Sequence, residues 1–285
     1  MANVAFLGTG LLGSALAEAA AGRGDSVVAW NRTADKARAL ERFGVRAAAT
    51  PAEAVRGASR VHLVLKDDAA VEEVVAAAKP GLSPDAVVLD HTTALPSTTA
   101  ARAKRLRAEG VAYMHCPVFI GPAAARQAQG IVLVAGPKAL YDRVAAGLAP
   151  MATKVLYVGE RDDLAALDKL FGNAVIIGLV GILADVLAVA REGGVDPADA
   201  IELLKGLDLN NMLARRGTAM AKGDATPSFE LAMARKDVGL MIDSAGGRPL
   251  AVLPSMAARM DALIAQGEGA ADCCVMGIER GGKPA

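Results

Sequence analysis

The chain has few cysteines and no excess charge of either sign. Cys116 and the adjacent Cys273 and Cys274 are its three cysteines, and their number and spacing fit neither a disulfide framework nor a metal site. We therefore assign them to packing and expect no bound metal. Thirty-one basic residues balance thirty-one acidic ones, so the chain has no overall field to attract nucleic acid or an anionic membrane.

The sequence also lacks a recognisable signal peptide and a long apolar run. No basic residue precedes the first apolar stretch, MANVAFLG. The longest strongly apolar run, residues 174–184, is shorter than the roughly 18 residues that a spanning helix needs, and Asn173 and Asp185 bound it. We expect a cytoplasmic protein without a membrane partner, in which this run forms a buried helix.

The first half of the chain alternates β-branched runs with alanine-rich amphipathic stretches. This alternation predicts an α/β fold, a Rossmann-type, doubly wound, mostly parallel sheet. Strands are expected at residues 4–7, 26–30, 60–65, 86–89, 112–115, 131–135 and 154–157, with helices such as 12–23, 34–43 and 98–109 between them.

The strand pattern stops at Asp162. Residues 164–192 contain no proline and predict one long helix, and further helices are expected at 197–205, 211–221, 230–245 and 254–266. A chain of 285 residues with 53% hydrophobic content can form two cores. We predict an α/β Rossmann-type domain over residues 1–160 and an all-helical domain over 161–285. The long helix is apolar nearly all round at 174–184, which predicts a homodimer or homotetramer through the helical domain.

A G-x-G-x-x-G motif follows the first predicted strand and opens the first helix. The first glycine permits a tight turn, the second lets the backbone approach a pyrophosphate, and the third allows close helix packing. The helix N-terminus adds free N–H donors. The expected cofactor contacts here are Gly8, Thr9, Gly10, Leu11, Leu12 and Gly13, with Leu65 and Lys66 after the third strand.

The second predicted strand ends in Asn31-Arg32-Thr33, where NAD-binding sites usually present an acidic residue. A carboxylate would repel a 2′-phosphate, whereas the Arg32 guanidinium can bind it bidentately, with Asn31, Thr33 and Lys36 assisting. The sequence therefore favours NADP(H). The alternative is a solvated Arg32 that pairs with Asp35.

Lys169 and Asn173 stand four residues apart on the long helix, so they project from one face. An ammonium can give a proton to a carbonyl oxygen, and the neutral amine can take it back. Taken alone, this spacing is more typical of a solvated helix face than of a catalytic site.

Several motifs occur together in order along the chain. They are GTGLLGSALA, the NRT of residues 31–33, DHTT at 90–93, CPV before Gly121, KLFGN at 169–173 and FELAMARKD at 229–237. With them the chain resembles the β-hydroxyacid dehydrogenases, the relatives of 3-hydroxyisobutyrate dehydrogenase and of the glyoxylate and succinic semialdehyde reductases. The resemblance implies that Lys169 is the general acid/base, that Asn173 holds the substrate, and that Thr92 or Thr93 lies near the nicotinamide.

The resemblance also implies residues from the carboxyl-terminal helices. Phe229 would flank the nicotinamide ring, and Lys236 with Asp237 would border the site, Lys236 reaching both cofactor and substrate. A surface ion pair is the alternative for Lys236 and Asp237.

One segment departs from the family pattern. Where the family commonly has D-A-P-V-S-G-G, this chain has His115-Cys116-Pro117-Val118-Phe119-Ile120-Gly121. Loss of the serine hydroxyl predicts a substrate that is bulkier or less polar than the short hydroxyacids. Alternatively, the two bulky side chains turn into the core and leave the backbone amides free. The expected substrate contacts are Pro117, Val118, Phe119, Ile120, Gly121 and Thr93, with Lys236 and Asp237.

The histidines are candidate acid–base groups because histidine titrates near neutral pH. With Lys169 available for that task, we interpret His91 and His115 as hydrogen-bonded structural residues and His62 as a core histidine.

These patterns predict an NADP(H)-dependent oxidoreductase that transfers hydride between the nicotinamide and a β-hydroxyacid or the corresponding aldehyde or ketone. One alternative is the reduction of C=N bonds, since imine reductases resemble the same architecture. The other is a dinucleotide-binding module without turnover.

Overall fold

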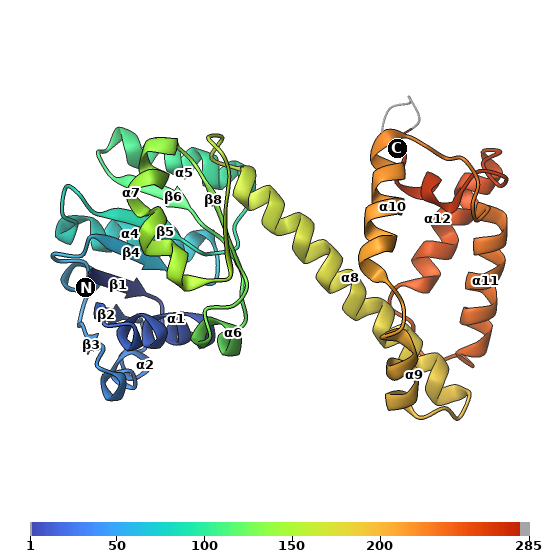
Figure 1. Cartoon of the computed structure of the whole chain (residues 1–285), viewed down its shortest axis with the longest axis horizontal. Helices are drawn as coiled ribbons and strands as arrows, with labels where there is room; N and C mark the ends of the chain where they lie inside the picture. The colour runs from blue at the N-terminus through green and yellow to red at the C-terminus, as the bar shows by residue number, and fades with distance from the viewer. Residues whose placement is uncertain (1, 280–285) are drawn as a thin grey trace. The chain divides into compact units, whose positions relative to one another are not determined.

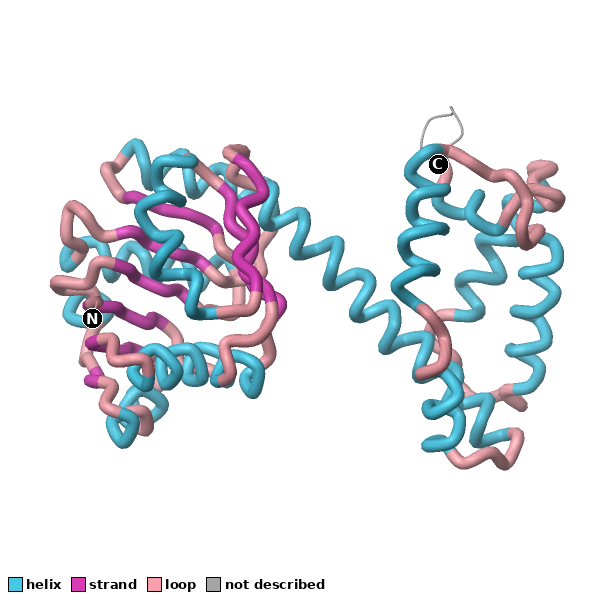
Figure 2. Tube along the Cα trace, in the orientation of Figure 1, coloured by secondary structure: helices cyan, strands magenta, loops and turns pink. Residues whose placement is uncertain are grey.

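The computed structural model describes residues 2–279, which form two compact units. The first ends at Asn173 and the second begins at Ala174. In the described residues all strands lie in the first unit, and the second is helical (Figures 1 and 2). The predicted order, an α/β part followed by an all-helical part, is confirmed.

The first unit is built on one nine-stranded sheet in the order β3-β2-β1-β4-β5-β6-β8-β7, with β9 beside β8. Its pairings are parallel except for those of β8 with β6 and β7. The predicted doubly wound, mostly parallel sheet is therefore confirmed. The strands are β1 (Asn3–Leu7), β2 (Ser26–Trp30), β3 (Arg46–Ala47), β4 (Arg60–Leu63), β5 (Val87–Asp90), β6 (Ala112–His115), β7 (Val118–Phe119), β8 (Ile131–Ala135) and β9 (Lys154–Gly159).

Helices connect these strands on both faces of the sheet (Figure 1). The α-helices are α1 (Leu11–Gly22), α2 (Ala34–Arg38), α3 (Pro51–Ala54), α4 (Asp68–Ala78), α5 (Pro96–Ala108), α6 (Pro122–Arg126) and α7 (Lys138–Leu148). Short 3-10 turns are η1 (Glu41–Phe43), η2 (Lys79–Gly81) and η3 (Ala149–Met151). The single helix predicted at 34–43 is wrong: the chain tightens after Arg38, and Leu40 enters the core with only 4% of its surface exposed.

The central strands are buried on both faces, as expected in a parallel sheet covered by helices. Neighbouring side chains point to opposite faces. Phe6 joins a cluster with Leu16 and Met114 on one side, whereas Leu7 joins a cluster with Leu63 on the other. Because the middle of each strand is buried, the polar side chains of the sheet lie mainly at the strand ends.

The long helix α8 (Leu164–Glu192) is 29 residues long, as predicted. Its start packs onto the sheet, because Leu164 and Ala165 contact a cluster that contains Leu133 and Ala135. The first turns of α8 therefore belong to the sheet unit, and Lys169 and Asn173 with them.

The second unit contains the rest of α8 with α9 (Pro197–Leu204), α10 (Leu209–Lys222), α11 (Leu231–Ser244), α12 (Leu253–Ala265) and the turn η4 (Cys273–Gly277). Leu231, Leu253 and Met260 belong to its core. The buried Asp185 carboxylate accepts hydrogen bonds from the backbone N–H groups of Ala251, Val252 and Leu253, at 2.5, 2.9 and 2.8 Å, and so fixes the start of α12 against α8.

The apolar part of α8 is exposed in the single chain. Ile177 is 67% and Val180 is 63% exposed, and only 17% of the most apolar 18-residue window is buried. The expected buried helix is therefore wrong for one chain taken alone. By length and composition α8 is able to cross a membrane, which is weak evidence because core helices of soluble proteins pass the same test.

Candidate functional site

The glycine motif forms a tight loop between β1 and α1. Gly8 has φ +101°, and a Cβ on it would lie 2.3 Å from the Val64 carbonyl oxygen. A Cβ on Gly13 would lie 2.0 Å from the Gly8 carbonyl oxygen, so α1 approaches the loop as closely as it does only because residue 13 has no side chain. These contacts agree with the roles assigned to the first and third glycines.

The second glycine has a different environment. Gly10 is the N-cap residue of α1, with φ −67°, and a Cβ built there meets nothing within 4 Å. The space above Gly10 is thus open at a helix N-terminus, where N–H groups lack partners and the dipole favours an anion. This space fits the pyrophosphate of a dinucleotide. Leu11, which is 85% exposed, borders it, whereas Leu12 packs against the core.

The end of β2 lies beside this loop. The Asn31 Oδ1 atom accepts a hydrogen bond from the Thr9 backbone N–H at 3.0 Å, and its Nδ2 donates to the Thr33 carbonyl oxygen at 3.1 Å. A cavity of about 260 Å³ follows, lined by Gly8, Gly10, Trp30, Asn31, Arg32, Thr33, Lys36, Val64, Leu65, Lys66, Ala70, Glu73 and Val74. The predicted cofactor residues after β2 and after β4 therefore line one cavity.

Arg32 has no ion pair within residues 2–279. Asp35, the partner weighed for it, pairs with Arg38 instead. The sequence reasoning missed Glu73 and Val74, which reach the cavity from α4. Helix α4 follows β4, the strand that pairs with β1 beside the glycine loop, and this position in the sequence could have indicated both residues.

The DHTT segment follows β5. Thr92 is buried: its Oγ1 accepts a hydrogen bond from the Leu65 N–H at 3.2 Å, and its own N–H donates to Asp90 Oδ1 at 3.0 Å. Thr93 is exposed. Thr92 therefore holds the backbone at the end of β5, and Thr93 is the threonine that a ligand can reach.

A buried ionic network lies beneath this segment. Asp90 is fully buried, and its Oδ2 accepts a hydrogen bond from the Tyr113 hydroxyl at 2.6 Å and one from Arg102 at 3.4 Å. Arg102 also pairs with Asp68 and Glu72. Burial alone would lower the pKa of Arg102, but the hydrogen bonds and charges of its partners raise it. The sequence reasoning missed Arg102, although its spacing from Leu106 places it on the buried stripe of α5.

The three histidines are buried and hydrogen-bonded, in agreement with the structural interpretation. His91 Nδ1 lies 2.6 Å from the Cys116 carbonyl oxygen, and His91 Nε2 lies 2.8 Å from His62 Nδ1. A carbonyl only accepts, so His91 donates through Nδ1 and accepts from His62. His115 Nε2 donates to the Thr92 carbonyl at 2.9 Å. Burial lowers the pKa of each histidine, which keeps all three rings neutral.

Lys169 lies beside Phe119, the residue at which this chain departs from the family pattern. The Lys169 Nζ atom is 4.0 Å from the centre of the Phe119 ring. Gly172 borders the same ring, since a Cβ there would lie 2.2 Å from its Cζ atom. Lys169 makes no ion pair with any described residue, and burial lowers the pKa of its amine. Asn173, one turn on, is half-buried.

The rest of the departing segment turns largely inward. Pro117 and Val118 are buried, and Ile120 packs against the core. Phe119 packs towards a cluster that contains Leu133. Only Gly121 is exposed, as the N-cap residue of α6. The structure therefore agrees with the alternative in which the bulky side chains face the protein.

The remaining predicted residues belong to the second unit. Phe229 is 38% exposed, and its N–H donates to Asp272 at 3.0 Å. Lys236 and Asp237 form an exposed ion pair at 3.1 Å on α11, the alternative weighed for them.

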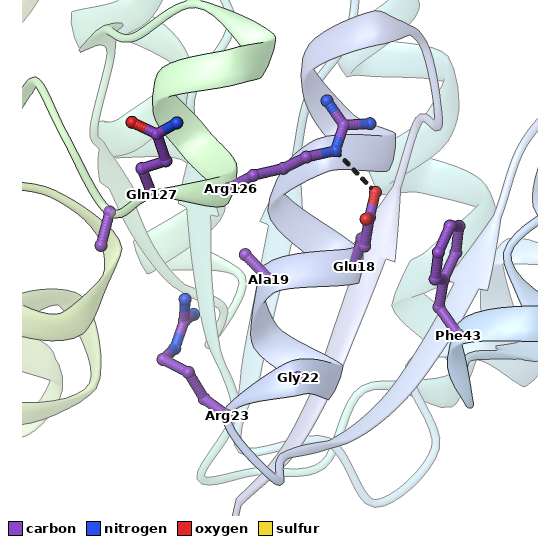
Figure 3. A pocket seen from close by; sticks show the side chains of 8 residues that line it. Glu18, Ala19, Gly22, Arg23, Phe43, Arg126 and Gln127 are labelled. Atoms are coloured by element: carbon purple, nitrogen blue, oxygen red, sulfur yellow. Dashed lines mark hydrogen bonds and ion pairs between the residues drawn. The ribbon is translucent and has the colours of Figure 1, made fainter.

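A second cavity of about 570 Å³ lies where α1, α6 and η1 meet (Figure 3). Glu18 and Arg126 bridge it with an ion pair at 2.8 Å, and Arg23 and Phe43 line it. It is the larger of the two cavities, but none of the predicted catalytic or cofactor residues reaches it. Among residues 2–279 no group of three or more His, Cys, Asp or Glu side chains is arranged to hold a metal ion.

A parallel sheet with a glycine loop at its first crossover, an open helix N-terminus and an adjacent cavity defines a nicotinamide-dinucleotide-binding dehydrogenase or reductase. The family model of the NAD binding domain of 6-phosphogluconate dehydrogenase matches residues 3–159. The model of the NAD-binding domain of NADP-dependent 3-hydroxyisobutyrate dehydrogenase matches residues 165–276. The chain belongs to the β-hydroxyacid dehydrogenase family.

Similar proteins agree with this assignment. An uncharacterized oxidoreductase of Shewanella frigidimarina is 29% identical over 250 residues, covering 86% of each chain. The chloroplastic glyoxylate/succinic semialdehyde reductase 2 of Arabidopsis thaliana is 26% identical, covering 84% of this chain and 68% of its own. A reductive aminase of Aspergillus terreus, solved with NADPH4, cyclohexanone and allyl amine, is similar in fold: its TM-score is 0.88 at 23% identity, covering 97% of this chain and 98% of its own.

Proposed function

We propose that the protein is an NADP(H)-dependent reductase or dehydrogenase that interconverts a carbonyl and a hydroxyl group on a small organic substrate. The observation that carries this proposal is the amine of Lys169, half-buried without a carboxylate partner in the unit that holds the glycine loop. The family assignment supports the reaction class.

The residues around the glycine loop fit the cofactor. The open space above Gly10 accommodates a pyrophosphate, and Arg32, Thr33 and Lys36 would surround a 2′-phosphate on the adenosine ribose. The neutral amide of Asn31 replaces the carboxylate that would repel this phosphate. When bound, the nicotinamide supplies or accepts the hydride.

Lys169 handles the proton in this proposal. Its ammonium gives a proton to the carbonyl oxygen during reduction, and its amine takes one from the hydroxyl during oxidation. Burial lowers the pKa of the amine, which brings the group closer to a working pH. Asn173, on the same face of α8, orients the substrate by hydrogen bonding.

The substrate class follows from the segment before α6. Phe119 and Ile120 replace the small polar residues of the family pattern and leave no side-chain hydroxyl there. Gly121, Pro122 and Thr93 remain near the accessible surface. We propose that the substrate is a carboxylic acid with an aldehyde or ketone group and that it is less polar or bulkier than glyoxylate.

The test compares NADPH oxidation by the wild-type protein and by Lys169→Ala, with glyoxylate, succinic semialdehyde and longer 2- and 4-oxo acids. We expect kcat to fall by about a hundredfold or more in the variant on every substrate that the wild type reduces. Lys154→Ala, which changes an exposed lysine on β9, is the matched control. A wild-type rate that survives in Lys169→Ala contradicts the proposal.

Reduction of C=N bonds is the second candidate. The absence of a side-chain hydroxyl at Phe119 and Ile120 favours it, and the Aspergillus reductive aminase is a protein of similar fold that was solved with a ketone and an amine. Lys169 counts against it, because C=N reduction needs no proton donor once the substrate is an iminium ion. Turnover of a cyclic imine that exceeds every carbonyl rate would select this candidate. Tight NADPH binding without turnover of any of the carbonyl substrates or of the cyclic imine would indicate a non-catalytic module.

We also propose that the protein is a homodimer or homotetramer through its helical unit. The exposed apolar side chains of α8, with Ile176 51%, Ile177 67% and Val180 63% exposed, support it, since such a stripe is rarely left in water. Sedimentation should detect a dimer or tetramer, and Ile177→Glu should weaken it. A stable monomer at micromolar concentration contradicts this proposal.

A further inference from the structure

The Lys169 ammonium lies over an aromatic ring. The Nζ atom stands 4.0 Å from the centre of the Phe119 ring, well within the distance of about 6 Å at which a cation is attracted to a ring face. The ring face is electron-rich, so it stabilises the charged ammonium and not the neutral amine.

Gly172 makes this arrangement possible. Lys169 and Gly172 are three residues apart on α8, so they share one face of the helix. A Cβ at residue 172 would lie 2.2 Å from Cζ and 2.6 Å from Cε1 of Phe119, which are distances that real structures do not allow. The missing side chain of Gly172 therefore leaves the space that the Phe119 ring fills.

The backbone fixes the other end of the ring. Phe119 ends β7 and pairs with Ile131 of β8 in an antiparallel register. The ring also packs against the cluster of buried apolar residues formed by Leu133, Ala135 and Ala165. The ring is thus held from the sheet side, and the lysine meets it from the helix side.

No charged side chain competes with the ring for the ammonium among residues 2–279. The acidic residues nearest in the chain are paired elsewhere: Asp162 with Arg107, and Asp163 with Arg161. Asp168 is adjacent to Lys169 on the helix and makes no ion pair with it. Burial lowers the pKa of the lysine, and no neighbouring charge contributes to the shift. The protonation of Lys169 therefore depends on burial and on the ring.

We infer that Phe119 is a positioning residue that holds the Lys169 ammonium on its ring face, in the space left by Gly172, and thereby keeps the lysine in its proton-donating form. This inference rests on the proposed function, in which the carbonyl oxygen takes a proton from Nζ as the carbonyl carbon gains a hydride. The N–H bond breaks, the O–H bond forms, and water then reprotonates the neutral amine. A held ammonium extends to higher pH the range in which Lys169 can protonate a carbonyl oxygen.

The test is an NMR titration of the full-length protein labelled with ¹³C at the lysine Cε. The Lys169 signal is assigned by its loss in Lys169→Arg. In Phe119→Leu, which keeps apolar volume but removes the ring, we expect the titration midpoint to move to lower pH by about half a unit. In Phe119→Tyr, which keeps a ring face, the midpoint should stay within about 0.2 units of the wild type. A midpoint unchanged or raised in Phe119→Leu overturns the inference.

A double-mutant cycle isolates the role of Gly172. Gly172→Ala should displace the ring and lower the midpoint in the wild-type background, and it should have no further effect in Phe119→Leu. An equal shift in both backgrounds would show that the alanine acts without the ring and would overturn the inference. If Phe119→Leu does not fold, Gly172→Ala in the wild-type background carries the test, and a midpoint that it leaves unchanged or raises overturns the inference.

The titration requires no turnover, so the two proposals fail separately. If Lys169→Ala keeps its activity while Phe119→Leu moves the midpoint, the proposed function falls and the ring–ammonium contact stands. If Lys169→Ala is inactive while the titration midpoint is the same in Phe119→Leu as in the wild type, only the inference about Phe119 is wrong. The pH profile of kcat/KM for carbonyl reduction provides a second readout. If Phe119 had only a structural role, Phe119→Leu would not shift the pH at which this profile rises or falls.

Discussion

Asn31 holds Thr9: the side-chain Oδ1 at the end of β2 accepts a hydrogen bond from the backbone N–H of the glycine loop, at 3.0 Å. Dinucleotide-binding sites often carry an acidic residue at this position. Here Asn31 occupies the position, and its hydrogen bond fixes the glycine loop. The charged groups that line the adjacent cavity are the cations Arg32, Lys36 and Lys66 and the acidic Glu73.

Arg32→Ala should lower the affinity for NADPH by about tenfold to a hundredfold and leave the affinity for NADH nearly unchanged, because only NADPH presents a 2′-phosphate. Fluorescence titration of both dinucleotides measures this. Arg38→Ala is the control, since Arg38 pairs with Asp35. If both affinities fall equally in Arg32→Ala, the phosphate contact is wrong.

Gly10→Ala and Gly13→Ala should separate binding from stability. The Gly10 Cβ position is open, so Gly10→Ala should keep its Tm and lose dinucleotide affinity, because the methyl group enters the space assigned to the pyrophosphate. Gly13→Ala should lower Tm by several degrees, because its Cβ would meet the Gly8 carbonyl at 2.0 Å. Wild-type affinity in Gly10→Ala would contradict the assignment.

Arg102→Met should destabilise the sheet unit by about 3–5 kcal/mol, because it leaves the Asp90 carboxylate buried without a cationic partner. Arg105→Ala, which breaks half-exposed pairs with Glu72 and Glu109, should cost less than about 1 kcal/mol. Urea unfolding followed by the fluorescence of Trp30 measures both. Similar midpoints for the two variants would argue against a buried ionic network.

Asp272 should control the acid stability of the helical unit. Burial would raise its pKa, but hydrogen bonds from the Cys274, Ser228 and Phe229 N–H groups hold that pKa well below its ordinary value. A depressed folded-state pKa stabilises the fold above the unfolded pKa, and this stability is lost as pH falls through the folded value. Wild type should therefore lose stability on acidification below pH about 4.

The matching variant is Asp272→Asn. It should be less stable than wild type at pH 7 and should lose less on acidification, as measured by thermal unfolding followed by circular dichroism. Asp261→Asn, which changes an exposed partner of Arg235, is the control. Parallel pH curves for wild type and Asp272→Asn would assign the acid loss to other carboxylates.

Regular elements with a strong periodic signal were predictable from the sequence. The helix at residues 164–192 was predicted with the bounds of α8, since it has no proline and Gly193-Gly194 follows it. Strand β3 was missed because its two residues, Arg46 and Ala47, are too few to form a pattern. The helix predicted at 34–43 breaks because burial of Leu40 overrides local propensity.

The part of the site that belongs to the glycine motif was predictable, because each glycine of that motif has a known structural reason. The roles of Gly8 and Gly13 follow from backbone geometry alone. The contact between Phe119 and Lys169 was not predictable, because it joins a short strand and a helix fifty residues apart in the chain. The sequence shows that Phe119 is unusual, but only the structure shows that Gly172 provides the space for it.

The three buried histidines of the sheet unit have a consequence for kinetics. His62 and His91 form a hydrogen-bonded chain that ends at the Cys116 carbonyl, and His115 donates separately to the Thr92 carbonyl. Burial lowers the pKa of all three rings. Rate–pH curves should therefore carry no imidazole inflection above the ordinary histidine pKa, and a slope there reports a group other than these three rings.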